Sequence, residues 1–375
     1  MKKTLAAVAV LGAFAGSALA ADVTVYGRLD TGLAYDKTQI EANGVEIADK
    51  HSFSMDSGNL TGSRVGIKGS EEISEGLTVG FVLEKGFKSD SGVDGDSKKA
   101  FDRESSIFVK TDFGSVYAGR IGTVWSDSGS IGKYAAIANV DGTGHSGIGN
   151  LGIGLLQISS TRYDNTLAYV SPKFGGFEAF AQYSMGEDGQ ENKAATDRYA
   201  AIGADYQAGG LQVAMVVENI NEKSAGNEVD DTLAVHVGGQ YDFGVAKVSA
   251  AAVYFDNAND FAGIVAKYNA QQTAAADKKV AADDASGYGV SLGVAVPVAG
   301  GTFYTTAGYI DGDAKVEGVN ADAKAYNIGV NYQYNLSKQV RVYTGAGYSK
   351  YEIDAVGLDA EQEDISVGAG MVYYF

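Results

Sequence analysis

The chain has 375 residues, and its 47 Asp and Glu residues outnumber its 29 Lys and Arg residues, which gives a formal net charge of −18. This acidic balance argues against nucleic acid as a partner, because a polyanion is bound through a basic surface that releases counterions. The sequence contains no cysteine, so it can form neither disulfides nor thiolate metal sites and must be stable without them.

The first 20 residues are expected to be a signal peptide that is removed on export. Two lysines precede an apolar run, and the run ends in an Ala-Leu-Ala sequence before Ala21, the small-x-small pattern of a signal-peptidase site. A transmembrane anchor is the alternative, but the apolar run is shorter than a spanning helix needs. The domain organisation expected is therefore a signal peptide at 1–20 and a single barrel domain at 21–375. Loss of the two lysines changes the formal net charge from −18 to −20.

Apolar residues alternate with polar or small residues in runs of about ten along the mature chain. The first run is DVTVYGRLDTGLAY and the last is EDISVGAGMVYYF. A period of two is typical of strands in which the two faces meet different surroundings. The sequence has only two prolines, Pro172 and Pro297, but 23 tyrosines and 15 phenylalanines, a composition that also favours strands.

Two kinds of connection separate these runs, and their order predicts the topology. The short turns lie at 71–76, 111–114, 173–176, 207–210, 242–244, 298–301 and 335–338, and the longer polar loops lie at 37–59, 89–99, 123–160, 187–196, 221–229, 257–285, 312–321 and 353–362. Seven short turns that alternate with eight longer loops require sixteen strands. An even number of strands with short turns on one side and long loops on the other is typical of an outer-membrane barrel.

The fold class predicted is therefore all-β, a transmembrane 16-stranded antiparallel β-barrel. A soluble β-sandwich or jelly roll is the alternative, since its strands also alternate. A sandwich has no need of such regular short and long connections, and sixteen strands are many for one such domain. A membrane requires a closed sheet, because an open edge in hydrocarbon leaves backbone groups unpaired.

The segment HSGIGNLGIG contains Gly147, Gly149 and Gly152 at the spacing of the GxGxxG motif that binds dinucleotides. The motif functions between a buried strand and a helix, because the pyrophosphate lies at the helix N-terminus. Here a polar, turn-rich stretch precedes it and an alternating run follows it. The segment therefore predicts a glycine-rich loop and no cofactor.

Other chemical motifs are also incomplete. The three histidines, His51, His145 and His236, are too far apart in sequence for a local zinc site. GTGHSGIG approaches a nucleophile elbow but lacks its second glycine, and no strand or helix flanks it. We therefore expect no catalytic residue, no metal and no enzymatic activity.

Several segments resemble the trimeric general diffusion porins of Gram-negative outer membranes. They are LTGSRVGIKGSEEISEGLTVGFVLEKGF, FDRESSIFVKTDFGSVYAGRIGT, YDNTLAYVSPKFGGFEAFAQYS, YNLSKQVRVYTGAGYS and the terminal Phe375. Together they cover most of the mature chain, in the order of the predicted strands. The resemblance implies a homotrimer in the cell outer membrane, in contact with outer-membrane lipid and lipopolysaccharide. It also implies that the barrel-assembly machinery reads Phe375.

The resemblance further implies that the third loop, residues 123–160, folds into the lumen and narrows it. Acids on that loop would face arginines on the opposite wall. The basic wall is expected to comprise Arg28, Arg64, Arg103, Arg120 and Arg162, and the loop acids Asp127 and Asp141. Alternation independently directs all five arginines except Arg103 away from the apolar face.

The function predicted is a passive, weakly selective, water-filled channel for ions and small hydrophilic solutes. Addition of Lys133 to the basic wall, and of Asp30, Glu84 and Asp164 to the acids, gives nearly balanced charges at the constriction, which predicts weak selectivity. A substrate-specific channel of the sugar-porin type is one alternative, but the inward faces are mainly Gly, Ser, Thr and charged residues. A structural or adhesive barrel is the other, and sixteen strands favour an open lumen over a plugged one.

Overall fold

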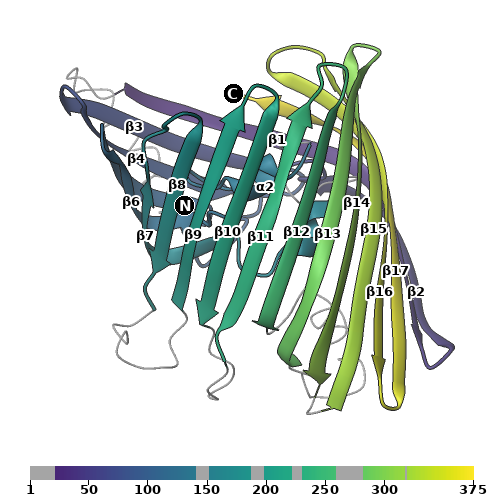
Figure 1. The fold of residues 1–375 in the computed structure, drawn as a ribbon. Coiled ribbons are helices and arrows are strands. Elements are labelled where there is room, and N and C mark those ends of the chain that lie inside the picture. The colour runs from purple at the N-terminus through teal and green to yellow at the C-terminus, as the bar shows by residue number, and fades with distance from the viewer. Residues whose placement is uncertain (1–21, 141–151, 187–197, 222–229, 259–281, 317–318) are drawn as a thin grey trace.

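The structure is a computed structural model that describes residues 22–140, 152–186, 198–221, 230–258, 282–316 and 319–375. The described residues form one antiparallel sheet that closes on itself (Figure 1). Its strands are β1 (Asp22–Ala42), β2 (Val45–Ser57), β3 (Arg64–Ser74), β4 (Leu77–Gly86), β5 (Glu104–Thr111), β6 (Gly114–Gly122), β7 (Arg162–Val170), β8 (Phe177–Ser184), β9 (Arg198–Ala208), β10 (Leu211–Asn221), β11 (Thr232–Asp242), β12 (Lys247–Ala258), β13 (Ala282–Val298), β14 (Gly301–Val316), β15 (Val319–Asn335), β16 (Val340–Ala355) and β17 (Leu358–Tyr374). A short helix, α2 (Tyr134–Ile137), and a 3₁₀ turn, η1 (Gly152–Leu156), lie between β6 and β7.

Two of the strands, β2 and β3, together occupy one strand position of the barrel. Both pair with β1, β2 along residues 31–42 and β3 along residues 22–28. The described sheet therefore has sixteen strand positions, which confirms the predicted number of strands. The barrel closes where β17 pairs with β1, and the Gly27 amide donates to the Phe375 carbonyl oxygen at 2.9 Å.

The seven predicted short turns all join neighbouring strands at one end of the barrel, the top in Figure 1. Three of the predicted long loops are instead hairpins, because β1–β2, β14–β15 and β16–β17 continue as paired strands to a tight connection. Asn43 and Gly44, for example, form a two-residue turn with φ of 52° and 74°, as a primed hairpin turn requires.

The outward faces of the strands are apolar over most of the barrel height. Tyrosines mark the loop side of this band, where they follow one another around the wall: Tyr254, Tyr288, Tyr309, Tyr326, Tyr348 and Tyr35. Tyr334 lies on the same strand and the same face as Tyr326, at the other edge of the apolar band. About nine residues of β15 therefore cross the band, the length that a tilted strand needs to span hydrocarbon. Among the described residues, no helix is both long and apolar enough to cross a membrane.

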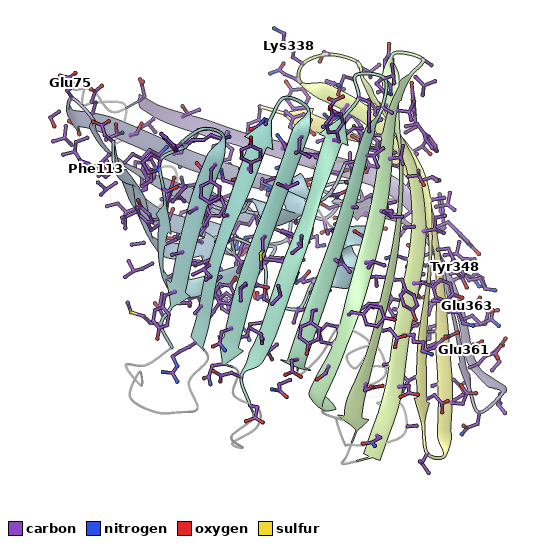
Figure 2. All side chains as sticks on the ribbon, in the orientation of Figure 1. Glu75, Phe113, Lys338, Tyr348, Glu361 and Glu363 are labelled. Carbon is purple, nitrogen blue, oxygen red and sulfur yellow. The ribbon has the colours of Figure 1, made fainter. Side chains whose placement is uncertain are left out.

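Beyond the tyrosines, the outward side chains of the long hairpins are charged. Lys350 pairs with Glu352 at 3.0 Å and with Glu361 at 2.7 Å, and Glu363 lies on the same surface below Tyr348 in Figure 2. Phe113 lies at the opposite end of the barrel, on a short turn. The outer surface is thus an apolar band with charged side chains beyond its loop-side edge, as in barrels that span a bilayer.

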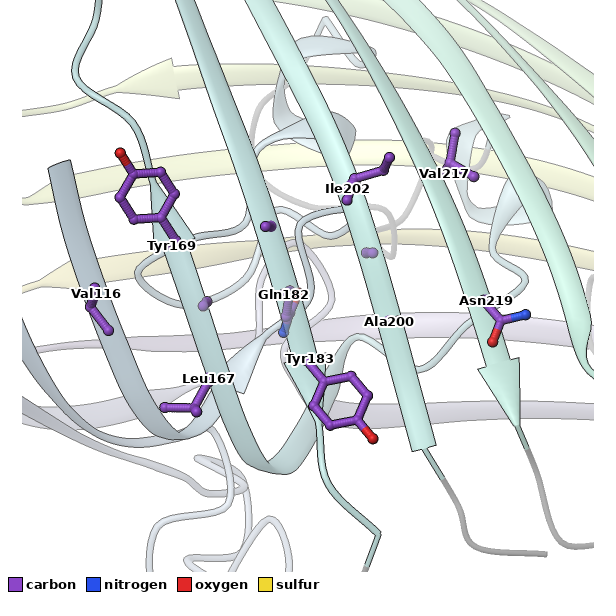
Figure 3. Close-up of a pocket in the computed structure, with 12 residues that line it drawn as sticks. Val116, Leu167, Tyr169, Gln182, Tyr183, Ala200, Ile202, Val217 and Asn219 are labelled. Atoms are coloured by element: carbon purple, nitrogen blue, oxygen red, sulfur yellow. The ribbon is translucent and has the colours of Figure 1, made fainter. Parts of the chain in front are cut away.

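One part of the apolar band is hollowed. Tyr169, Tyr183 and Ile202 surround the small side chains of Ala181 and Ala200 and leave a shallow apolar groove across β7–β9 (Figure 3). The groove faces outward, so it belongs to the surface in contact with the surroundings of the barrel and not to the lumen.

Candidate functional site

The third loop connects β6 to β7, and its described parts, residues 123–140 and 152–161, lie inside the barrel. α2 packs on β10 and β11, whereas η1 packs on β13 and β14 (Figure 1). Trp125, Tyr134 and Leu156 on this loop have no exposed surface. The inward-folded third loop that the sequence predicts is therefore confirmed.

Glycines on the inner wall allow the loop to approach the strands closely. A β-carbon on Gly238 in β11 would lie 2.9 Å from the β-carbon of Ala138, and one on Gly289 in β13 would lie 2.6 Å from Leu156 Cδ2. Both distances are too short for real side chains, so glycine is required where the loop rests on the wall.

Gly152, the last glycine of the GxGxxG pattern, makes a packing contact with β14. Its amide donates to Thr306 Oγ1 at 3.3 Å, and a β-carbon on Gly308 would lie 2.6 Å from its carbonyl oxygen. Gly147 and Gly149 lie outside the described residues. The part of the pattern that the structure describes therefore supports the loop interpretation.

A buried hydrogen-bond network joins both ends of the loop to the wall. Trp125 Nε1 donates to His236 Nδ1 at 3.0 Å, and this bond leaves the proton of the neutral imidazole on Nε2, which faces Glu218 Oε2 at 2.9 Å. Glu218 Oε1 accepts from Ser159 Oγ at 2.7 Å and from Tyr199 at 2.5 Å. We call Trp125, His236, Glu218, Ser159 and Tyr199 the loop tether. All five residues are at most 2% exposed, so water cannot replace these bonds.

Tyr134 in α2 lies against the loop tether. Its ring centroid is 5.4 Å from that of His236, and its hydroxyl donates to the Ala252 carbonyl oxygen at 3.3 Å. Burial and the nearby negative charge of Glu218 raise the pKa of Tyr134, which keeps the hydroxyl protonated as this bond requires.

Glu104 at the start of β5 holds the middle of the loop. Glu104 Oε1 accepts from Ser130 Oγ at 2.6 Å and from Ser106 Oγ at 2.7 Å, while Oε2 accepts from the Ser130 amide at 3.0 Å. Gly129 allows this approach, because it has φ of 67° and lies beside Oε2. The loop is thus anchored on β5 as well as on β10 and β11.

Four of the five predicted arginines lie on β1, β3, β6 and β7, and Arg103 directly precedes β5; the five form one group, which we call the arginine cluster. Arg28 and Arg64 are opposite each other in the register of β1 and β3. Arg162 Nε donates to the Arg103 carbonyl oxygen at 2.8 Å, and Arg120 Nε donates to the Asp102 carbonyl oxygen at 2.6 Å. The charge of Arg64 is repelled by those of Arg28, Arg103 and Arg162. Like charges are therefore concentrated on this wall.

Two carboxylates are in contact with the arginine cluster. Glu84 Oε1 accepts from Arg103 Nε at 2.7 Å and lies 3.6 Å from Arg64 Nη1. Asp164 accepts from Arg120 Nη1 at 2.7 Å and also pairs with Lys99. These acids hold the arginines in place but compensate only part of their charge.

The sequence places Asp30 and Lys133 among the charges of the constriction, but the structure engages both of them elsewhere. Asp30 has no exposed surface, and it accepts hydrogen bonds from the amides of Leu60 and Thr61 and from the hydroxyl of Tyr343. These bonds hold in place the segment between β2 and β3, which interrupts the strand position that the two strands share. Lys133 is paired with Glu178 at 2.8 Å.

Asp127 on the third loop is half-buried, and its negative charge acts on Arg162. The described loop thus places one acid toward the arginine cluster, whereas Asp141 lies outside the described residues. The sequence interpretation gave no role to Glu218, Glu104 or His236 in the loop.

Comparison with known proteins agrees with this geometry. The sequence matches the family model of Gram-negative porins over residues 6–354. It is 31% identical to an outer membrane porin protein of Bordetella pertussis over 382 aligned residues, which cover 93% of this chain and 94% of the relative.

Two solved structures are similar in fold. An anion-selective porin from Comamonas acidovorans has a TM-score of 0.69 at 23% identity, with 95% of this chain and 100% of that chain covered. A trimer form of OmpT, an outer membrane protein of Vibrio cholerae, has a TM-score of 0.58 at 20% identity, with 95% and 100% covered.

Proposed function

Because the chain belongs to the Gram-negative porin family, we propose that its arginine cluster and third loop form the constriction of the channel. The protein is an outer membrane porin, and passive passage of ions and small hydrophilic solutes follows the concentration gradient. No step of this passage needs a catalytic residue or a cofactor.

The observation that carries the proposal is the excess of arginine at the wall that faces the loop. Five arginines lie there with Glu84, Asp164 and the loop acid Asp127. A unit charge about 8 Å from a passing ion changes its energy by about 0.5 kcal/mol in water. The uncompensated arginines therefore give a weak preference for anions.

The experiment that tests the constriction is the reversal potential of single channels in a salt gradient. In the variant R64Q/R103Q/R162Q, three positive charges are removed, so the energy of an anion rises and that of a cation falls by about 1.5 kcal/mol each before screening, or about a tenfold change in the local concentration of either ion. We expect the reversal potential to move toward cation preference, and to move less at higher salt.

The matched control removes three exposed cations from the turn side of the barrel, in the variant K110Q/K173Q/K338Q. These residues lie outside the arginine cluster, so this variant should keep the original reversal potential. If the two triple variants shift equally, the effect is one of net charge, and the arginine cluster does not line the path of the ions.

We further propose that the channel is a homotrimer in outer-membrane lipid and lipopolysaccharide, and that the barrel-assembly machinery recognises Phe375. The trimer form of a structural neighbour and the apolar outer band support this assembly. Conductance that appears in steps of three at reconstitution would support the trimer, and isolated single steps would contradict it.

A further inference from the structure

A polar pocket of about 390 Å³ lies at the turn-side end of β9–β12. Gln207, Gln212 and Gln240 stand in one row across β9, β10 and β11, because each is the register partner of the next. Asp242 and Lys247, which face each other across β11 and β12, form the next row toward the rim. The pocket is of the size of small-molecule sites, about 300–1,000 Å³.

The pocket belongs to the inner wall and begins where the third loop ends its contact. Gln240 lies two positions after Gly238 in β11, on the same face, and Gly238 is the residue on which α2 rests. A solute that has passed the loop toward the turn side therefore meets this row of amides. The arginine cluster lies on other strands, β1 to β7.

One buried polar atom of the pocket residues lacks a hydrogen-bond partner within the described structure. Gln240 Nε2 donates to Gln212 Oε1 at 2.7 Å, so Gln240 Oε1 is directed away from it. This oxygen is buried and has no hydrogen-bond partner among the described residues. A buried acceptor without a donor costs about 1–3 kcal/mol, which a bound N–H group would recover.

The two charged groups of the pocket are opposite in sign and separate from each other. Asp242 Oδ1 accepts from the Gly244 amide at 2.7 Å, which holds the carboxylate in the turn. In the described part of the chain, Lys247 makes no ion pair with Asp242 or with any other acid, although the two are register partners. A ligand with one positive and one negative group can therefore contact both.

We propose that this pocket is a binding subsite for zwitterionic α-amino acids and small peptides on the turn side of the constriction. The ligand carboxylate binds Lys247, its ammonium group binds Asp242, and an N–H group donates to Gln240 Oε1. The inference rests on the proposed channel function, since the solute reaches the pocket through the lumen.

Single-channel recording with L-glutamine on the turn side tests this subsite. L-Glutamine carries both charges and an amide, whereas acetate carries only the carboxylate and isobutyramide only the amide. We expect glutamine to interrupt the current at lower concentration than either analogue. In K247M and in Q240M, loss of one bond should raise the apparent dissociation constant by about tenfold.

The matched control is K338M, which removes a lysine from an exposed turn at the same rim but outside the pocket (Figure 2). K338M should bind glutamine as the unaltered channel does. Equal interruption by glutamine and acetate, or equal affinity in K247M, Q240M and K338M, would overturn the subsite while the channel still conducts. Loss of conductance in the unaltered protein would instead contradict the proposed function.

Discussion

Replacement of Trp125 by phenylalanine removes one N–H donor from the loop tether and keeps most of the aromatic packing. Trp125 Nε1 is 3.0 Å from His236 Nδ1, and neither side chain has exposed surface, so the acceptor cannot turn to water. An unsatisfied buried polar group costs about 1–3 kcal/mol. The population in which this end of the loop has left the wall should therefore rise by about 5- to 150-fold.

Single-channel recording at fixed voltage and salt measures this population as transient changes of the open-state current. We expect W125F to show more frequent transients at the same main conductance. The matched control is Y134F, which also removes one donor from the loop, but its bond to the Ala252 carbonyl oxygen is longer, 3.3 Å. If transients are equally rare in W125F and Y134F channels, the Trp125–His236 bond does not hold the loop, and the reasoning is refuted.

Three further outcomes are expected. Trp125 is the single tryptophan of the chain and is fully buried, so acrylamide should quench its fluorescence weakly, and more strongly in S159A, which loses a bond of the loop tether; equal quenching in both proteins would contradict this. Deletion of Phe375 should lower the yield of folded barrel in cells, and an unchanged yield would limit Phe375 to the aromatic edge of the outer band. G27A should also lower the yield, since a β-carbon there would lie 2.5 Å from both the Arg64 carbonyl oxygen and the Phe375 ring. Mass spectrometry of the outer-membrane protein should give a chain that starts at Ala21, and an intact Met terminus would contradict the signal peptide.

The strands and short turns could be predicted because one physical pattern repeats. Wherever a strand faces an apolar band on one side and the lumen on the other, its side chains alternate, and the seven short turns interrupt this alternation. The three long hairpins could not be predicted in this way. Their outward side chains, such as Lys350 and Glu361, are charged, so the apolar period disappears although the backbone ladder continues.

The candidate site could be predicted only where a residue type limits the choices. An arginine on a spanning strand has few places other than the lumen, because a charge facing lipid at mid-depth costs about 2–4 kcal/mol. Glu218 and Glu104 obey the same rule, but their partners, Ser159 and Ser130, come from a loop whose path inside the barrel is a tertiary feature. From the sequence, Asp30 is expected among the charges of the constriction because its side chain points inward. Backbone amides bind its carboxylate, however, and the residue has no surface exposed to the water of the lumen.

The acidity of the whole chain and the proposed basic wall of the constriction are compatible because the two sets of charges act at different distances. Many of the acids, such as Glu361 and Glu363, lie on the hairpins beyond the apolar band. At about 0.15 M salt, charges farther than about 8 Å are largely screened, so these acids have little effect on an ion in the constriction. The acids close to the arginines, Glu84 and Asp164, are engaged in direct ion pairs. The remaining positive charge is therefore local, and the proposed ion preference follows the arginine cluster even though the protein as a whole carries a negative net charge.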